Sequence, residues 1–237
     1  MNPQFDRSAM LIGYDGLELL KKRHVAVFGL GGVGSFCAES LARAGIGRLT
    51  LVDFDVIDIT NLNRQLLALH STIGQGKAEV MRARLADINP EAEIAAVKMF
   101  YGGESCGSLE LAPFDYIVDA IDTVTAKLLL IERAKEAGVP IISCMGTGNK
   151  LDPSLLEATD LSLTAGCPLA RIMRKELRKR GITSLKVVYS KEPPVKPLFE
   201  AKNAAPGRHS PGSLPFVPPA AGLLMAFEVV KELLEYR

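Results

Sequence analysis

Short apolar runs alternate with amphipathic segments through the first two-thirds of the chain. Five runs rich in Val, Ile and Leu have the length of buried strands, and the segments between them have helical length and spacing. The predicted strands cover 25–30, 49–54, 93–99, 116–121 and 140–145, and the clearest predicted helices cover 34–44, 76–88 and 124–137. A further amphipathic helix is predicted over 17–23, before the first strand. Strands that alternate with helices predict an α/β fold: a Rossmann-like, doubly wound, mainly parallel sheet with helices on both faces.

The pattern changes in the last third of the chain. A mixed segment that reads as strand or loop is followed by a basic amphipathic helix, a strand, a long polar segment and an apolar closing helix. In order, these cover 151–160, 168–180, 185–190, 191–219 and the residues from Pro218 onward. Because the long segment is rich in Pro, Ser and charge and has no apolar period, we expect a mobile loop or lid.

Length and composition limit the class of protein. The 237 residues, 48% apolar and 23% charged, allow one sizeable core, and we expect a single domain with a core over 1–150 and an extension over 151–237. No apolar run reaches the ~18 residues of a membrane span, and the first residues lack the apolar core of a signal peptide, which predicts a cytoplasmic protein. With a net charge of only +1, a nucleic-acid partner requires a local basic patch.

The four cysteines, at positions 37, 106, 144 and 167, form no C-x-x-C pair. We therefore expect no structural zinc site and a set of reduced thiols. Cys144 lies within an apolar run and is predicted to be a small core residue. Cys167 follows a glycine in a predicted loop and is the one candidate for a reactive thiol, a role that requires a lowered pKa.

A glycine-rich turn joins the first predicted strand to the helix that follows it. The turn contains Gly29, Gly31, Gly32 and Gly34, and Asp53 ends the second predicted strand. Glycines let the backbone approach phosphate closely at the positive end of a helix, and a carboxylate in this register accepts hydrogen bonds from ribose hydroxyls. The pattern predicts a nucleotide site, although by itself it fits NAD, FAD or ATP.

Phosphate ligands are concentrated after the second strand. Beyond Asp55, the segment before the next helix carries Asn61, Asn63, Arg64 and Gln65, and Lys77 lies in the first turn of that helix. When a carboxylate attacks the α-phosphate of ATP, an arginine and a lysine lower the repulsion between the two anions and stabilise the departing pyrophosphate. The pattern therefore favours ATP and an adenylating enzyme.

Two further observations separate an adenylating enzyme from a dehydrogenase. Asp119 and Asp122 end the fourth strand at the carboxyl edge of the sheet, where one carboxylate, Asp122, suits Mg²⁺. The three histidines, at positions 24, 70 and 209, are not placed to serve as the acid or base that hydride transfer needs. A dehydrogenase and a non-catalytic nucleotide-binding scaffold therefore stay as less favoured alternatives.

Together these residues resemble the ubiquitin-activating-enzyme-like adenylyltransferases, the family that includes the activating enzymes of thiamine and molybdopterin synthesis. The likeness covers about residues 5–150. It implies that Asp53 holds the ATP ribose and that Arg64 and Lys77 contact the phosphates. It also implies that Asp122 takes part in Mg²⁺ binding and catalysis.

The resemblance also bears on assembly and substrate. Arg7 resembles the family's arginine that reaches the ATP of the partner subunit, which implies a homodimer, and Gln4 stands where some relatives have arginine. Thr123 follows Asp122 where the relatives that activate proteins usually have asparagine, and their zinc-binding cysteine pairs are absent. Both departures favour a substrate other than a protein.

Within this family, the closer resemblance is to the branch that dehydrates threonylcarbamoyladenosine in tRNA. The shared segments run nearly end to end: Gly32–Ser35, Gly45–Gly47, Asn61–Gln65, Ile88–Pro90, Asp119–Asp122, Lys150–Pro153 and Phe216–Leu224. This resemblance implies ATP-dependent activation of the threonine carboxylate beside the anticodon, then ring closure with loss of water and no enzyme thiol. The alternative is activation of the C-terminal glycine of a sulfur-carrier or ubiquitin-like protein, and a sulfur-transfer protein is a further candidate partner.

A tRNA substrate needs a docking surface, and the basic helix predicted at 168–180 offers one. Its cations fall mainly on one side, and those predicted to bind tRNA phosphates are Arg171, Arg174, Lys175 and Arg178. The alternative interpretation is an ordinary solvated face. Further cations in the polar segment, Lys196, Lys202, Arg208 and His209, are predicted to become ordered on RNA.

Overall fold

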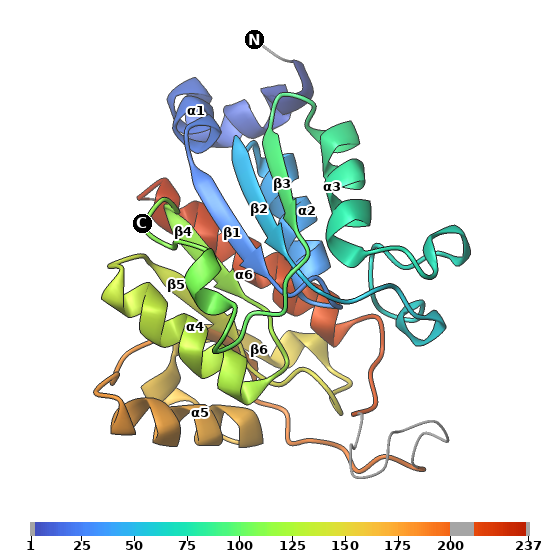
Figure 1. Cartoon of the computed structure of the whole chain (residues 1–237), viewed down its shortest axis with the longest axis vertical. Helices are drawn as coiled ribbons and strands as arrows, with labels where there is room; N and C mark the ends of the chain where they lie inside the picture. Colours follow the sequence, from blue (N-terminus) through green and yellow to red (C-terminus); the bar gives the residue numbers. More distant parts are fainter. Residues whose placement is uncertain (1–2, 200–210, 236–237) are drawn as a thin grey trace.

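Within residues 3–199 and 211–235, which the computed structural model describes, a seven-stranded sheet carries helices on both faces (Figure 1). The strands are β1 (His24–Phe28), β2 (Arg48–Val52), β3 (Glu93–Val97), β4 (Tyr116–Asp119), β5 (Ile141–Cys144), β6 (Leu156–Asp160) and β7 (Lys186–Ser190). The helices are α1 (Asp6–Lys21), α2 (Gly34–Ala44), α3 (Lys77–Ile88), α4 (Val124–Glu136), α5 (Pro168–Lys179) and α6 (Val217–Leu233), with short 3-10 turns between them.

The order of the strands confirms the predicted doubly wound fold. It is β3-β2-β1-β4-β5-β7-β6, and the neighbouring strands are parallel except for β6, which runs antiparallel to β7 at one edge. From β1 the order builds outward through β2 to β3, and from β4 it builds outward in the other direction. The chain therefore changes direction between β1 and β4, and in such sheets ligands bind at the carboxyl ends of these two strands.

Most predicted elements lie within two residues of their observed positions, and the main difference is at the start of the chain. The sequence predicts a helix over 17–23, whereas α1 begins at Asp6 and is interrupted at Gly13, whose φ of 72° no helix allows. In the predicted loop, residues 191–199 and 211–216 form neither helix nor strand, while 200–210 lie outside the described part of the chain. In the mixed segment, residues 156–160 form β6.

Successive residues of a strand pack into different cores. In β1, Val25 and Val27 belong to the core formed with α2, α3 and α6, whereas Ala26 and Phe28 belong to the core formed with α4 and α5. Side chains alternate between the two faces of a strand, so burial of both faces requires apolar residues at nearly every position. This explains the near-continuous apolar runs that predict these strands.

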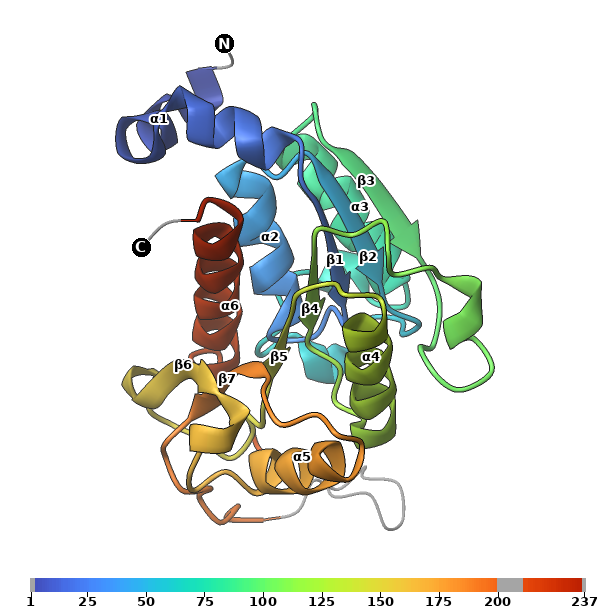
Figure 2. The same cartoon turned by 90° about the vertical axis from the view of Figure 1, so that its left-hand side faces the viewer.

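Helices α2 and α6 lie side by side on one face of the sheet, as Figure 2 shows. Gly222 of α6 makes this close approach possible, because a methyl group there would collide with the carbonyl oxygen of Val33, just before α2. The closing helix thus packs directly against the start of the helix that follows the glycine turn. Among the described residues, no helix is long and apolar enough to cross a membrane.

We predict that Gly222→Ala destabilises the protein by about 1–3 kcal/mol, because the added methyl group forces α6 away from Val33. Without such a collision, alanine in place of glycine inside a helix would stabilise by about 1 kcal/mol, so the sign of the change is decisive. Urea denaturation measures this change in the free energy of unfolding. Gly107→Ala, where an added methyl group meets no atom within 4 Å, is the control, and a stabilised Gly222→Ala would contradict the packing described.

Candidate functional site

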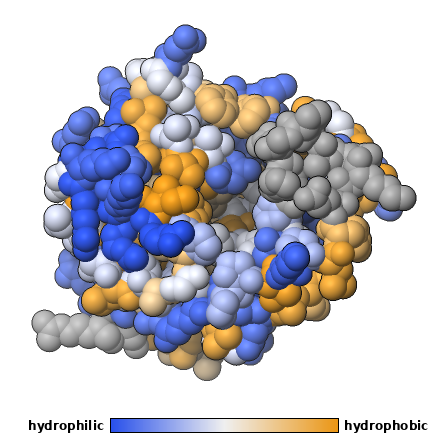
Figure 3. Space-filling view, turned by 90° about the horizontal axis from the view of Figure 1, so that it is seen from below, coloured by the Kyte–Doolittle hydropathy of each residue, from blue (hydrophilic) through white to orange (hydrophobic). Residues whose placement is uncertain are grey.

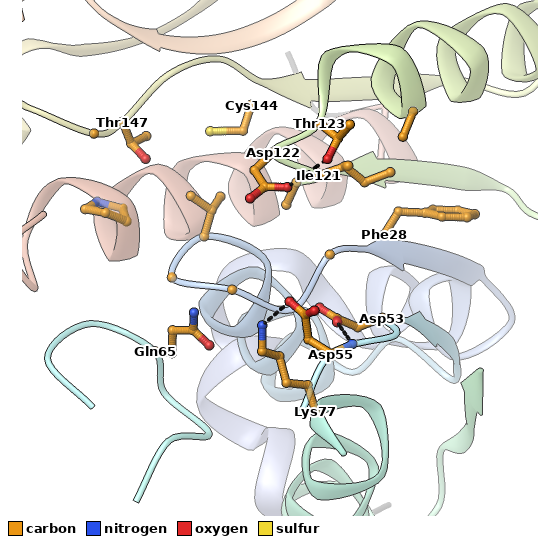
Figure 4. A pocket seen from close by; sticks show the side chains of 18 of the residues that line it. Phe28, Asp53, Asp55, Gln65, Lys77, Ile121, Asp122, Thr123, Cys144 and Thr147 are labelled. Atoms are coloured by element: carbon orange, nitrogen blue, oxygen red, sulfur yellow. Dashed lines mark hydrogen bonds and ion pairs between the residues drawn. The ribbon is translucent and has the colours of Figure 1, made fainter. Parts of the chain in front are cut away.

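A pocket of about 860 Å³ opens at the carboxyl edge of the sheet, where the chain changes direction between β1 and β4. Of the residues predicted from the sequence to bind nucleotide or metal, those that line it are Gly29, Gly31, Gly32, Asp53, Asp55, Asn61, Arg64, Gln65, Lys77 and Asp122. Gly34 and Asn63 lie beside the pocket without lining it. Figure 4 shows Asp53, Asp55, Gln65 and Lys77 on one side, facing Asp122 and Thr147 on the other.

Close packing of backbone fixes the glycine turn against the loop that follows β4. Gly29 has a φ of +85°, and a Cβ atom there would lie 2.6 Å from the carbonyl oxygen of Ala120. At Gly34, a Cβ atom would collide with the carbonyl oxygen of Gly29. These two glycines shape the turn, whereas Gly31 and Gly32 line the pocket, where their missing side chains leave room for a ligand next to the backbone.

Asp53 ends β2 and braces the glycine turn. One carboxylate oxygen accepts a hydrogen bond from Leu30 N at 2.6 Å, and the other accepts one from Asp55 N at 2.8 Å. Burial raises the pKa of this carboxyl, while the charge of Lys77 and the two N–H groups oppose the shift. Each oxygen keeps a second lone pair, so Asp53 is able to accept a hydroxyl from a ligand while it holds the turn.

An ion pair between buried Lys77 and partly exposed Asp55 supplies a cation on this side of the pocket. Lys77 is the first residue of α3 and only 5% exposed, and its Nζ lies 2.8 Å from Asp55 Oδ2. The backbone repeats this link, because Lys77 N donates to Asp55 O at 3.0 Å. A solvated surface lysine is thereby excluded. The ammonium group is held in the wall of the pocket, where a phosphate can become its second partner.

Arg64 and its neighbours form the entrance on the same side. The guanidinium is half-buried and donates to Thr60 O and Asn63 Oδ1, both at 3.0 Å, and burial lowers its pKa. Asn63 in turn donates to Ser213 O at 2.9 Å, so that this segment touches the residues before α6. Gln65 is buried, and its side-chain oxygen has no hydrogen-bond partner among the described residues. That oxygen is an unsatisfied acceptor in the pocket wall.

The two carboxylates that follow β4 have different environments. Asp122 is exposed in the pocket and accepts a hydrogen bond only from Thr123, at 3.3 Å, among the described residues. Asp119 is fully buried and forms an ion pair with Lys127, so only one of the two carboxylates expected at this edge is open to a ligand. The described residues contain no cluster of three or more metal-binding side chains. A single carboxylate nevertheless suits Mg²⁺, which takes most of its ligands from phosphates and water.

Two walls of the pocket were missed in the sequence. Phe54 and Phe100 pack edge to face with ring centroids 5.0 Å apart, and together with Tyr101 they form an aromatic wall. Opposite, residues 144–148 at the end of β5 form the far end together with Leu169 of α5. Except for Leu169, these residues lie at or just after strand ends, so the rule that ligands bind at the carboxyl edge would have located them.

The basic helix presents three of its four predicted cations to solvent. Arg171, Lys175 and Arg178 are exposed, and at spacings of four and three residues they share one face of α5. Arg174 is only partly exposed, and its Nη1 donates three hydrogen bonds to Leu161 and Thr164, so its contact with tRNA stays a prediction. From the end of the molecule at which α5 lies, hydrophilic side chains gather on one side of a hollow (Figure 3).

The remaining predicted residues lie away from the pocket. Arg7 is exposed on α1, at the amino end of the strands and thus at the opposite edge of the sheet (Figure 1). In the polar segment, Lys196 is exposed, whereas Lys202, Arg208 and His209 lie outside the described residues.

The cysteines are buried or used within the fold. Cys167 lies in the loop just before α5, as predicted, but it is only 5% exposed, and its Sγ accepts a hydrogen bond from Ala170 N at 3.5 Å as the cap of α5. Cys144 lies at the inner end of the pocket, where burial raises the pKa of its thiol to about 12. Neither thiol has the solvent exposure that is typical of a reactive cysteine.

Comparisons with known proteins agree with this geometry. The model of the ThiF family matches residues 5–237, and the chain therefore belongs to the ThiF family. It is 45% identical to the tRNA threonylcarbamoyladenosine dehydratase of Bacillus subtilis, over 98% of this chain and 95% of that protein. These findings confirm the resemblance drawn from the sequence.

Two further proteins show how far the likeness extends. The structure of the Escherichia coli tRNA N6-threonylcarbamoyladenosine dehydratase in complex with ATP matches with a TM-score of 0.88 and 33% identity, over 98% of this chain and 94% of that one. The molybdopterin-synthase adenylyltransferase of Salmonella typhimurium is 39% identical, but over only 59% of this chain and 57% of that protein. The dehydratases are therefore similar over the C-terminal extension as well.

Proposed function

We propose that this protein is an ATP-dependent enzyme that dehydrates threonylcarbamoyladenosine in tRNA through an acyl-adenylate. One observation carries the proposal: a single pocket places Lys77 and Arg64 on one side and the open carboxylate of Asp122 on the other. Such a pocket suits the cleavage of a triphosphate between its α and β phosphates. The near full-length similarity to dehydratases, one of them solved with ATP, supports the choice of substrate.

In this proposal, the side chains of the phosphate side bind and polarise ATP. The glycine turn receives the phosphates on backbone N–H groups, and Asp53 accepts a ribose hydroxyl. Lys77, released in part from Asp55, and Arg64 neutralise the charge that grows on the leaving pyrophosphate. Because both cations are partly or fully buried, their interaction with phosphate is stronger than it would be at the surface.

The reaction follows from the charges that the pocket brings together. A carboxylate oxygen of the substrate bonds to the α-phosphorus, and the bond to the bridging oxygen of pyrophosphate breaks. An atom of the same substrate's carbamoyl group then attacks the activated carbonyl carbon, a proton is lost, and AMP departs with one carboxylate oxygen. Because the nucleophile is already attached to the substrate, the second step needs no enzyme thiol, in agreement with the burial of the one pocket cysteine, Cys144.

Mg²⁺ completes the proposal. The open carboxylate of Asp122 would hold it together with the phosphates of ATP, and the ion would neutralise charge on the phosphate oxygens. The absence of further carboxylates next to Asp122 in the described residues is compatible with this ion, because it keeps several waters in most nucleotide sites.

The assembly and the partners also belong to the proposal. Arg7 is too far from the pocket of its own chain to touch a ligand there, and it lies on α1 near the exposed side chains of Met10 and Leu11. A homodimer that covers α1 and brings Arg7 to the partner's ATP fits these features. We place the enzyme in the cytoplasm, where a tRNA substrate would meet it, and a sulfur-transfer protein partner stays a prediction.

The direct test incubates the protein with ATP, Mg²⁺ and tRNA that carries threonylcarbamoyladenosine, then digests the RNA for mass spectrometry. We expect the modified nucleoside to lose one water, and AMP and pyrophosphate to form in equal amounts. Asp122→Ala should lower turnover by about 100-fold or more while the melting temperature stays close to that of the wild type. Glu79→Ala on the exposed face of α3 is the control.

Two outcomes would contradict the proposal. Unchanged nucleoside together with ATP–pyrophosphate exchange that requires a sulfur-carrier protein would favour the alternative function. Full activity of Asp122→Ala would show that this carboxylate does not take part in the reaction.

The exposed cations of α5 provide the second prediction. Reversing the charge of Arg171 and Lys175 to glutamate should weaken tRNA binding and reduce the slope of log affinity against log salt by about one unit for each removed phosphate contact. Arg82→Glu, an exposed change on α3, should leave the slope unaltered. Filter-binding titrations at several salt concentrations measure these slopes. Equal slopes for the wild type and the double variant would refute binding through this face.

A further inference from the structure

Lys127 is a fully buried lysine whose side chain lies behind the pocket. It occupies the first turn of α4 and has no exposed surface. It does not belong to the residues that line the pocket, so it has no route to a bound nucleotide. A lysine ammonium is rarely buried so completely, and its partners explain why it is placed there.

The residue holds the chain on both sides of Asp122. Its Nζ lies 2.9 Å from Asp119 Oδ2 and donates to Ile121 O at 3.1 Å, while its backbone N donates to Thr123 O at 3.0 Å. The carbonyl groups of Ile121 and Thr123, the residues on either side of Asp122, are therefore both bonded to Lys127. Asp122 itself is left free to face the pocket.

Asp119 completes this arrangement from the sheet side. One of its oxygens accepts Ile121 N at 3.1 Å, and the other accepts Ser143 Oγ of β5 at 2.6 Å in addition to the ion pair. Both backbone polar groups of Ile121 are thus taken up by the side chains of one buried pair. Because Asp119 ends β4 and is bonded to Ser143 of β5, the pair fixes the position of the loop 120–123 relative to the centre of the sheet.

The same loop presses on the phosphate side of the pocket. Ala120, which precedes Ile121, is the residue that the glycine turn approaches most closely at Gly29. A shift of Ile121 would therefore move Asp122 and would change the distance between Asp122 and the glycine turn. The two sides of the pocket are connected through one short segment.

We propose that Lys127 is a positioning residue for the adenylation step: it fixes the placement of Asp122 relative to the glycine turn through Ile121. The inference rests on the proposed function, in which Asp122 faces the phosphates. Lys127 contributes through geometry and touches no ligand. Its removal should therefore lower kcat while ATP still binds.

The test uses the double variant Asp119→Asn/Lys127→Met, which removes the hydrogen bond from Lys127 to Ile121 O without leaving an unpaired buried charge. On modified tRNA we expect kcat to fall about 100-fold, the cost of a displacement of about 1 Å, with KM for ATP within about threefold of the wild type. Lys135→Met, an exposed change on the same helix, should leave both constants as they are. Wild-type kcat in the double variant would overturn the proposal.

A second measurement separates positioning from a general loss of stability. Added to Asp122→Asn, the double substitution should cause no further fall in kcat, because the carboxylate that it positions is already gone. A product of the two separate losses in kcat would overturn the proposal.

If the double variant does not fold, Ser143→Ala removes a hydrogen bond from the Asp119 carboxylate. In that variant kcat must again fall without a change in KM for ATP.

Hydrogen exchange reports the loop without any substrate. Faster exchange of the Ile121 amide in the double variant is expected, and unchanged exchange would overturn the proposal. If the wild-type protein does not act on tRNA while the loop loosens as expected, only the proposed function fails. If the wild type is active and kcat of the double variant is normal, only the role of Lys127 fails.

Discussion

The contact between the glycine turn after β1 and the loop after β4 is the constraint on which the rest of the site depends. Only a residue without a side chain allows the backbone of Gly29 to lie against the carbonyl of Ala120. The contact joins the two halves of a doubly wound sheet at the point where the chain changes direction. It places the glycine turn and the carboxylate of Asp122 on opposite sides of one pocket. Any substitution that widens this contact would separate the two sides.

Ion pairs with buried lysines hold each side of the pocket. On the side of the glycine turn, Lys77 is paired with Asp55 and Asp53 accepts two backbone N–H groups, so this side keeps its shape. On the other side, the pair of Lys127 and Asp119 fixes the loop. Groups held in this way need little rearrangement when charge develops in a transition state, which is the basis of electrostatic catalysis. A protein that cleaves ATP at the α-phosphate benefits from such an arrangement.

Much of this could be read from the sequence, because the signals are local. The glycine turn, Asp53 and Lys77 lie at strand ends and helix starts that the apolar pattern locates, and the pocket contains all three. The environments that the sequence does not reveal depend on how neighbouring elements pack. Arg174 reads as part of a basic stripe, but its guanidinium is bonded to Leu161 and Thr164, and Cys167 reads as a loop thiol, but it is buried. Nothing in the helical pattern marks Lys127 as the buried partner of Asp119. The aromatic pair of Phe54 and Phe100 comes from two different loops that only the folded sheet brings together.

In the proposed reaction, a carboxylate of the tRNA substrate attacks the α-phosphate of ATP. A substrate tRNA whose threonine carboxyl group carries a heavy oxygen isotope in both positions reports this attack. After turnover with unlabelled ATP, we expect AMP that contains one labelled oxygen and pyrophosphate that contains none. ADP with labelled inorganic phosphate, or AMP without label, would rule out attack of the carboxylate on the α-phosphate.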